Sequence, residues 1–505
     1  MDQTSLTKVF DLFSPQFLLL LPLVFFILKY ISSPSSKNQS LPPGPKPWPV
    51  LGNLLHLGKK PHISMASFAT THGPLISLKL GKQLLVVGSS KRAATEILKS
   101  HDRLLSARYV SKAALFESHV LDRIAIVWAT QCSDGWKSLR ALCRNELFSA
   151  TAIESQAVLR EKKMEEMVEF IGRREGEVVR IGEVVLAIVF NTIANLIFSV
   201  DLIGLEDDGA ATGLKSLMWR MMKLGATPNI ADFYPILGGI DLQGLKRKMA
   251  VCVNQMFGVW GKHIKERREK HVQDGPRSDF LDVFLANGFE DLQINWVAME
   301  LLAAGTDTTA TTVEWAMAEL LKNKQILERV SEEIKREMDT NSLKESRISQ
   351  LPYLNACVKE TLRLHPPVPF LIPRRALESC EVMGYTIPKD SEVIVNVWAV
   401  GRDPSLWEDP LSFKPERFLG SGLDFKGHDY EFLPFGAGRR ICPGLTMAAR
   451  QVHLIIASLL YHFDWSLPNG EDPAMLDMSE KFGITLQKEH PLLVVPRRRI
   501  QVSKC

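Results

Sequence analysis

The residues with the clearest chemical potential form a glycine-rich loop around one cysteine, Phe435-Gly436-Ala437-Gly438-Arg439-Arg440-Ile441-Cys442-Pro443-Gly444. Small residues let backbone N–H groups and a flat ligand approach the sulfur closely. Because proline favours the first turn of a helix, we expect an apolar helix from about Leu445 towards Leu460. A cysteine at a helix N-terminus favours the thiolate, and Arg440 adds a cation able to hold a carboxylate. The alternative is a glycine-rich turn that buries an inert cysteine.

A second polar cluster lies in the middle of a long helix predicted from Asn295 to Asn323. The stretch Ala303-Ala304-Gly305-Thr306-Asp307-Thr308-Thr309 interrupts apolar turns. A mid-helix glycine costs about 1 kcal/mol relative to alanine, and buried threonine hydroxyls bond to backbone carbonyls. Since such local violations mark functional sites, we expect a ligand groove here, with Asp307 and Thr308 relaying protons. The alternative is a tight helix crossing that requires small residues.

The spacing F-x-x-G-x-R-x-C-x-G, met by Phe435, Gly438, Arg440, Cys442 and Gly444, resembles the haem-binding loop of cytochrome P-450 monooxygenases. The resemblance implies that Cys442 is the axial ligand of haem iron, and a thiolate ligand favours O–O cleavage. The stretch from Ala304 to Thr309 is similar to the oxygen-activation motif A-G-x-D-T-T of the same family. It implies that Thr308 and Asp307 are the catalytic residues.

Further matches imply the residues that surround the haem. Trp136, Arg140, Arg374 and Arg108 match positions that contact the haem propionates in the family. Trp136 and Arg140 are four residues apart and share one helical face, which would also suit a surface arginine stacked on a tryptophan. Phe370, Phe482 and Ile484 fall where family members line the substrate chamber, although each of them also suits an ordinary core.

A structural element of the family is matched by two segments. Glu360 and Arg363 lie at i and i+3 on a helix that is stopped by His365-Pro366-Pro367, and Arg417 lies in Pro415-Glu416-Arg417-Phe418. An exposed pair at this spacing stabilises a helix by only about 0.3 kcal/mol. In the family, however, the matching three residues form a buried ionic triad that supports the cysteine loop. The resemblance implies the same for Glu360, Arg363 and Arg417.

Composition limits the remaining possibilities. The 505 residues carry a formal net charge of only +4, which gives no reason to expect nucleic acid as a partner. The seven cysteines are scattered without a C-x-x-C pair, so neither a zinc site nor a disulfide scaffold is indicated. The resemblance implies a mainly α fold with small β-sheets (α+β), the cytochrome P-450 fold. Strands are expected as a hairpin over Leu75–Val87 and, near the pocket, over Val368–Leu371 and Glu392–Val400.

The N-terminal region predicts a membrane anchor and a hinge. A 20-residue stretch from Val9 to Leu28, interrupted by Asp11 and Gln16, is just long enough to span a bilayer. Lysines follow this stretch, which places its downstream side in the cytoplasm. The alternative to a retained anchor is a cleaved signal peptide. Five prolines between residues 41 and 49 give a stiff hinge. We therefore expect a membrane anchor over residues 1–31, a proline-rich hinge over 32–50 and a haem-thiolate catalytic domain over 51–505.

The resemblance also implies cofactors, partners and reaction. Haem b and O₂ would serve as cofactors, and the chain has no Gly-rich dinucleotide fingerprint, so NADPH would act only through a partner, NADPH–cytochrome P-450 reductase. We expect a single-pass protein of the endoplasmic reticulum membrane, with its catalytic domain on the cytosolic side.

Two stretches, 313–320 and 478–483, are similar to two neighbouring plant groups. One group oxidises alkaloids, as N-methylcoclaurine hydroxylase and littorine mutase do, and the other hydroxylates monoterpenols such as geraniol. We favour hydroxylation of an alkaloid. Radical rearrangement or phenol coupling of an alkaloid, hydroxylation of a monoterpenol, and a non-enzymatic haem-binding sensor remain as alternatives.

Overall fold

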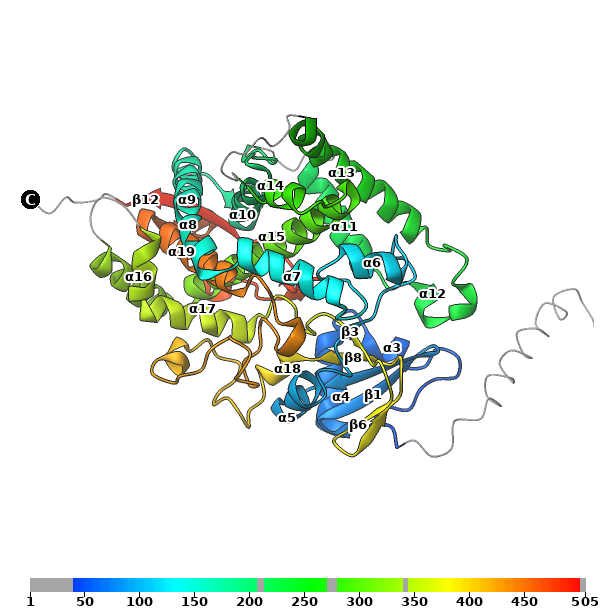
Figure 1. The fold of residues 1–505 in the computed structure, drawn as a ribbon. Coiled ribbons are helices and arrows are strands. Elements are labelled where there is room, and N and C mark those ends of the chain that lie inside the picture. Colours follow the sequence, from blue (N-terminus) through cyan, green and yellow to red (C-terminus); the bar gives the residue numbers. More distant parts are fainter. Residues whose placement is uncertain (1–39, 207–212, 270–278, 339–343, 500–505) are drawn as a thin grey trace, which may run out of the picture.

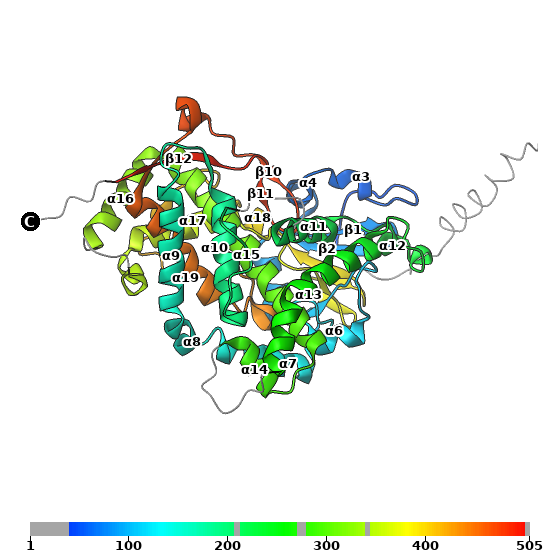
Figure 2. The ribbon, with the colours of Figure 1, turned by 90° about the horizontal axis from the view of Figure 1, so that it is seen from above.

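The computed structural model describes residues 40–206, 213–269, 279–338 and 344–499, and the predicted anchor over 1–31 lies outside them. The described residues form many helices and four small sheets, as predicted, with the largest sheet at one end of the molecule (Figure 1; Figure 2). The α-helices are α3 Leu54–Leu57, α4 Pro61–His72, α5 Lys91–Thr95, α6 Ser118–Ile124, α7 Asp134–Glu146, α8 Ala150–Ser155, α9 Ala157–Gly172, α10 Ile181–Phe198, α11 Leu214–Ala226, α12 Ile230–Phe233, α13 Leu245–Glu269, α14 Phe280–Ala286, α15 Asp291–Lys322, α16 Lys324–Glu337, α17 Pro352–Leu364, α18 Val397–Val400 and α19 Leu445–His462.

Helix α15 is the central element of the helical part. It begins with a capping box between Glu290 and Gln293, and it packs against α10, α13, α17 and α19. A Cβ atom added to Gly305 would lie 2.6 Å from the Cδ1 atom of Ile193 in α10. Gly305 therefore lies at the contact between α15 and α10, where a larger residue would require the side chain of Ile193 to move.

Helix α10 is the one helix in the described part of the chain that is long and apolar enough to cross a membrane. Fourteen of its residues, among them Val185, Phe190 and Ile197, are buried inside the protein. Since its apolar surface is covered by neighbouring helices, we interpret α10 as a core helix.

The largest sheet has five strands in the order β1-β2-β8-β5-β3, with β2 and β8 parallel and the other pairs antiparallel. Alternate residues of these strands pack into two separate hydrophobic clusters on opposite faces of the sheet. Val86 and Val393 belong to one cluster, whereas Val87 and Ile394 belong to the other. In the described residues the strands are β1 Leu75–Leu80, β2 Gln83–Gly88, β3 Ala107–Arg108, β4 Val179–Arg180, β5 Arg374–Arg375, β6 Cys380–Val382, β7 Tyr385–Ile387, β8 Glu392–Val395, β9 Phe463–Ser466, β10 Glu480–Lys481, β11 Gln487–Lys488 and β12 Leu493–Arg498. The predicted hairpin over Leu75–Val87 is confirmed as β1 and β2.

The strand predicted over Glu392–Val400 is wrong in its second half. The side chain of Asn396 accepts a hydrogen bond from the backbone N–H of Ala399 at 3.1 Å and so caps α18. Its amide also donates to the backbone carbonyl of His62 at 2.9 Å, which fixes the side chain in the core. A single buried asparagine thus converts the expected strand into a helical turn.

The strand predicted over Val368–Leu371 is also wrong, because this segment forms a turn. Pro369 has no N–H group to donate to a strand, and Leu371 adopts a positive φ of 55°. In this conformation the side chain of Leu371 lies against Gly436 of the cysteine loop. The turn therefore joins the end of α17 to that loop.

The described part of the predicted hinge lies along β1. Ser77 donates its backbone N–H to the carbonyl of Pro43 at 2.9 Å and its hydroxyl to the carbonyl of Pro42 at 2.6 Å. A Cβ atom at Gly44 would lie 2.1 Å from the carbonyl oxygen of Ser77, so only glycine permits this close approach.

Strand β8 carries a carboxyl group with a strongly shifted pKa. Burial and the nearby carboxylate of Asp232 raise the pKa of Glu392 from 4.5 to about 8. The folded protein then binds the proton more tightly than the unfolded chain, so this contribution to stability is present below about pH 4.5 and is lost as the pH rises through about 8. We expect Glu392→Gln to raise the free energy of unfolding at about pH 8.5 by about 2 kcal/mol, with little change near pH 5.

Unfolding of the holoenzyme at both pH values, followed by circular dichroism, measures this difference. Glu381→Gln is the matched control because Glu381 is an exposed glutamate on the short strand β6. Equal stability changes for Glu392→Gln at both pH values would contradict the prediction.

Candidate functional site

The cysteine loop has the backbone that its glycines require. The N–H of Cys442 donates to the carbonyl of Phe435 at 3.0 Å and closes the loop. Gly438 has a φ of 71°, and a Cβ atom there would lie 2.5 Å from the carbonyl oxygen of Leu98. The ring of Phe435 packs edge-to-face on Phe425, with ring centroids 5.4 Å apart. Helix α19 then begins at Leu445, as predicted, and runs two residues beyond Leu460.

The surroundings of Cys442 have opposing effects on the pKa of its thiol. Burial raises the pKa of Cys442, while a hydrogen bond from the backbone N–H of Gly444 and the charge of Arg140 lower it. The net shift is upward, so burial outweighs the helix N-terminus that we expected to favour the thiolate. Arg140 also donates from Nη2 to the carbonyl of Ile441, which is the residue before the cysteine.

Four arginines gather beside this loop: Arg108 in β3, Arg140 in α7, Arg374 in β5, and Arg440 in the 3₁₀ turn Gly438–Arg440. Arg108 and Arg374 are directly opposed in the antiparallel register of β3 and β5. Like charges in such positions repel each other. Burial, Arg440 and Arg374 together lower the pKa of Arg108 well below its usual value. The cluster is therefore a strongly cationic region inside the protein.

The guanidinium groups are held mainly by backbone carbonyls, which carry no full negative charge. Arg108 donates to Val127 at 3.1 Å and to Ile372 at 2.8 Å. Arg440 donates to Ser106 at 2.9 Å and to Ala129 at 2.7 Å, while its buried Nη1 atom has no partner. Carboxylates are the groups that compensate such a cluster, since an unpaired buried charge is costly. The two propionates of haem fit this requirement.

The ring of Trp136 contacts two of these arginines. The guanidinium carbons of Arg440 and Arg140 are 4.5 and 5.3 Å from the indole ring centroid. The indole N–H donates to the carbonyl of Ile126 at 2.9 Å. In this structure the Trp136 ring contacts the two guanidinium groups, and its N–H group is bound by a backbone carbonyl of the protein itself.

Two acidic residues that the motifs did not reveal organise this region. Asp102 accepts hydrogen bonds from Arg374 Nη1 and from the backbone N–H of Arg439, both at 3.0 Å. Glu300, buried in α15, accepts from the backbone N–H groups of residues 126–128 at 2.6, 3.0 and 3.2 Å. Because the carbonyls of Ile126 and Val127 hold Trp136 and Arg108, Glu300 fixes both indirectly. Neither acid belongs to a recognisable motif, so only the fold reveals them.

Thr308 and Asp307, neighbours in the polar cluster of α15, have different hydrogen-bond partners. The hydroxyl of Thr308 donates to the carbonyl of Ala304 at 2.7 Å, and its side chain is partly accessible. The carboxylate of Asp307 is buried, and it accepts hydrogen bonds from the Thr485 hydroxyl and, at 3.0 Å, from Gln487 Nε2. Burial raises the pKa of Asp307, whereas these two hydrogen bonds lower it. Thr485 and Gln487 follow α15 by more than 160 residues, and no spacing rule connects them with it.

The three residues predicted to line the substrate chamber lie near two different helices. The rings of Phe370 and Phe482 meet edge-to-face, with centroids 5.6 Å apart. Phe482 also stacks on the imidazole of His62 in α4 at 5.5 Å. Ile484 contacts Gly225 in α11, where a Cβ atom would lie 2.8 Å from the Cδ1 atom of Ile484. Phe482 and Ile484 belong to the same turn between β10 and β11.

Glu360, Arg363 and Arg417 form one ionic group behind the cysteine loop. The carboxylate of Glu360, which is fully buried, accepts two hydrogen bonds from Arg363 at 2.7 Å and one from Arg417 at 3.1 Å. It also accepts the backbone N–H of Lys414 at 2.8 Å. Arg363 also donates hydrogen bonds to the carbonyls of Gly401 and Pro410 at 2.5 and 2.7 Å. The group thus joins α17 to the segment that precedes the cysteine loop.

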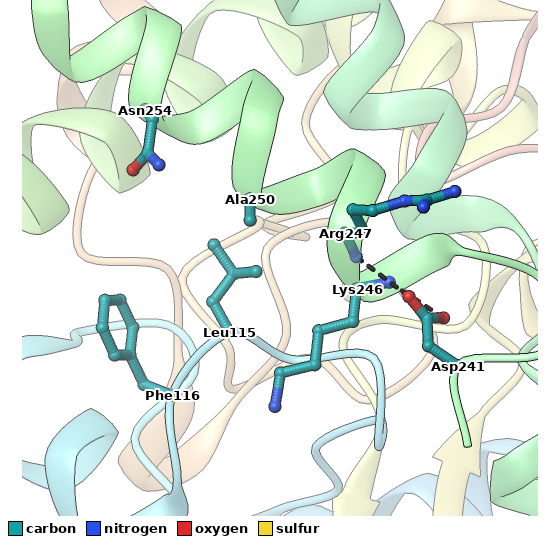
Figure 3. A pocket seen from close by; sticks show the side chains of 7 residues that line it. All are labelled: Leu115, Phe116, Asp241, Lys246, Arg247, Ala250 and Asn254. Carbon is teal, nitrogen blue, oxygen red and sulfur yellow. Dashed lines mark hydrogen bonds between the residues drawn. The ribbon is translucent and has the colours of Figure 1, made fainter. Parts of the chain in front are cut away.

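A cavity of about 430 Å³ lies between the loop that precedes α6 and the first turns of α13. Figure 3 shows Leu115 and Phe116 on one side and Ala250 and Asn254 on the other. The carboxylate of Asp241 accepts hydrogen bonds from the backbone N–H groups that start α13. None of the site residues predicted from the sequence lines this cavity.

Comparison with known proteins agrees with this geometry. The family model described as cytochrome P-450 matches residues 42–495. The chain is 49% identical to (S)-N-methylcoclaurine 3'-hydroxylase isozyme 1 of Eschscholzia californica, over 95% of this chain and 99% of that protein. It is 43% identical to corytuberine synthase of Coptis japonica, over 95% and 99%, and 42% identical to geraniol 8-hydroxylase of Catharanthus roseus, over 95% and 98%. The chain belongs to the cytochrome P-450 family and is a monooxygenase that uses haem, O₂ and electrons from a redox partner.

Proposed function

We propose that this monooxygenase hydroxylates an alkaloid, and that N-methylcoclaurine is the first substrate to test. The observation that carries the proposal is the 49% identity, over nearly the whole of both chains, with a hydroxylase of that compound. The similarity to a geraniol hydroxylase is lower, at 42%. A monoterpenol is therefore the second candidate substrate.

In this proposal the cationic cluster and the cysteine loop hold the haem. Arg108, Arg140, Arg374 and Arg440 bind the two propionates, and Trp136 keeps two of these guanidinium groups in place. Cys442 supplies the axial sulfur, and Phe435 and Gly438 give its loop the required shape. The bound haem supplies the chemistry of O₂ activation and C–H oxidation. The ionic group of Glu360, Arg363 and Arg417 keeps the loop in register with α17.

The remaining proposed roles concern protons and substrate. Asp307 takes protons from the solvent side and passes them to the face of α15 that carries the Thr308 hydroxyl. Phe370, Phe482 and Ile484 form an apolar wall against which a largely aromatic substrate packs. Electrons come from NADPH–cytochrome P-450 reductase at the endoplasmic reticulum membrane. A single N-terminal anchor holds the catalytic domain on the cytosolic side.

The test supplies the full-length protein with reductase, NADPH, ¹⁸O₂ and either N-methylcoclaurine or geraniol. If the protein hydroxylates an alkaloid, N-methylcoclaurine gives a product that carries one ¹⁸O atom from O₂, and geraniol gives no product. A product that forms without added oxygen would indicate rearrangement or coupling. Turnover of geraniol alone would replace the alkaloid as the substrate, and NADPH consumption that no substrate changes would favour a haem-binding sensor.

A further inference from the structure

The turn between β10 and β11, residues 482–486, touches two parts of the proposed site. Together with Gln487, the first residue of β11, it provides both hydrogen bonds to the carboxylate of Asp307. The same turn carries Phe482 and Ile484 of the proposed substrate wall. One short segment therefore connects the surface that substrate would press on with the group that would supply protons.

The base of this turn is firmly held. Glu480 in β10 binds His62 Nε2 at 2.9 Å, Trp398 Nε1 at 3.0 Å and Arg402 Nη2 at 3.4 Å. On the other side, Trp315 Nε1 donates to the carbonyl of Leu486 at 2.9 Å. Because both ends are fixed, a displacement of the turn is confined to residues 482–485.

The carboxylate of Asp307 is directed towards this turn. Consecutive residues of an α-helix point about 100° apart, so Asp307 and Thr308 leave α15 in different directions. Both carboxylate oxygens of Asp307 are engaged by Thr485 and Gln487. While both bonds hold, the carboxylate stays directed towards the turn, so its reorientation towards Thr308 requires at least one of them to be released. Within α15, the Thr308 hydroxyl donates to the carbonyl of Ala304 and not to the Asp307 carboxylate.

We propose that Thr485 and Gln487 are positioning residues that hold Asp307 away from Thr308 until substrate packs against Phe482 and Ile484. A substrate that displaces the turn lengthens the Thr485–Asp307 hydrogen bond and frees the carboxylate. Without substrate, proton delivery is slow, and electrons from NADPH are not wasted in reducing O₂ to H₂O₂. The inference rests on the proposed function, in which Asp307 and Thr308 relay protons.

Three variants of the holoenzyme test the inference. Thr485→Val removes the hydroxyl, Thr485→Ser retains it, and Gln487→Met removes the second donor. The matched control is Thr192→Val, which removes an equally buried hydroxyl that donates to Ile188 in α10. The first measurement is the infrared band of the Asp307 carboxyl group, the antisymmetric stretch of its carboxylate form, identified by its loss in Asp307→Asn. It is recorded with and without N-methylcoclaurine or geraniol, whichever gives the larger shift of the Soret band. The second is the oxidation of NADPH and the release of H₂O₂ without substrate.

We expect Thr485→Val to shift the carboxyl band, to abolish its response to substrate, and to increase substrate-free NADPH oxidation about fivefold, the effect of one hydrogen bond. Thr485→Ser should behave as wild type, Gln487→Met should show the same changes to a smaller extent, and Thr192→Val should show none. An unchanged carboxyl band in Thr485→Val, with wild-type substrate-free NADPH oxidation, would overturn the inference. If Thr485→Val does not bind haem, Gln487→Met decides by the same two measurements.

The proposed function fails by a different result. If Asp307→Asn keeps wild-type turnover and a wild-type solvent isotope effect, Asp307 is not the proton relay. If Asp307→Asn lowers turnover while the Thr485 and Gln487 variants keep the wild-type carboxyl band and wild-type NADPH oxidation, only the positioning role is wrong.

Discussion

Replacing Cys442 by alanine is expected to abolish product formation completely. The proposed axial ligand is lost, and no other sulfur can replace it within the cysteine loop. The Gly438 turn and the cationic cluster remain, so the protein is expected to fold. The carbon monoxide difference spectrum of the reduced protein measures the loss directly, because the Soret position reports a thiolate ligand.

Cys132→Ser provides the matched control for this prediction. Cys132 is also half-buried, and it lies beside the same arginines, with its sulfur 4.0 Å from the carbonyl oxygen of Ser106. It should retain the thiolate-type spectrum and turnover. Retention of both by Cys442→Ala would show that another residue ligates the iron and would refute the proposed site.

Replacing Glu360 by alanine is expected to lower the free energy of unfolding by about 3–5 kcal/mol, because it leaves Arg363 buried without its carboxylate. Arg363 is only 2% exposed, so water cannot replace the lost partner. The loss extends to Arg417 and the backbone N–H of Lys414, which bond to the same carboxylate. Chemical unfolding of the holoenzyme, followed by circular dichroism, measures the change. We also expect haem to dissociate at lower denaturant concentrations.

Glu328→Ala is the control for this second prediction. Glu328 pairs with Lys324 at 3.8 Å across one turn of α16, and both side chains are exposed. An exposed pair of this kind contributes about 0–1 kcal/mol. If Glu360→Ala were no more destabilising than Glu328→Ala, the ionic group would have no structural importance.

Local sequence patterns were sufficient wherever neighbouring residues decide the structure. The long helix around Asp307, the helix after Cys442, and the hairpin at Gly81 all depend on periodicity, on proline and on glycine. The predicted strand after Glu392 failed because its end depends on Asn396, which bonds to a carbonyl 334 residues away. A long-range hydrogen bond of this kind leaves no periodic signal in the chain.

The site shows the same division. Its motif residues were visible because glycine, cysteine and arginine occur at fixed spacing within one loop. Asp102, Glu300 and Thr485 escaped because each acts on a segment far away in the sequence, through backbone N–H groups or a single carboxylate. The direction of the Asp307 side chain could not be predicted either, since its hydrogen-bond partners belong to the hairpin of β10 and β11.

The parallel pairing of β2 with β8 has a consequence for biosynthesis. Gln83 and Glu392, which bond across these strands, are 309 residues apart. At about 5–20 residues per second, the ribosome releases β8 about 15–60 s after β2. During that interval one edge of β2 has no partner strand, and the nascent chain is open to aggregation and to chaperones. Host cells that translate slowly should therefore yield less soluble enzyme, even when their haem supply is ample.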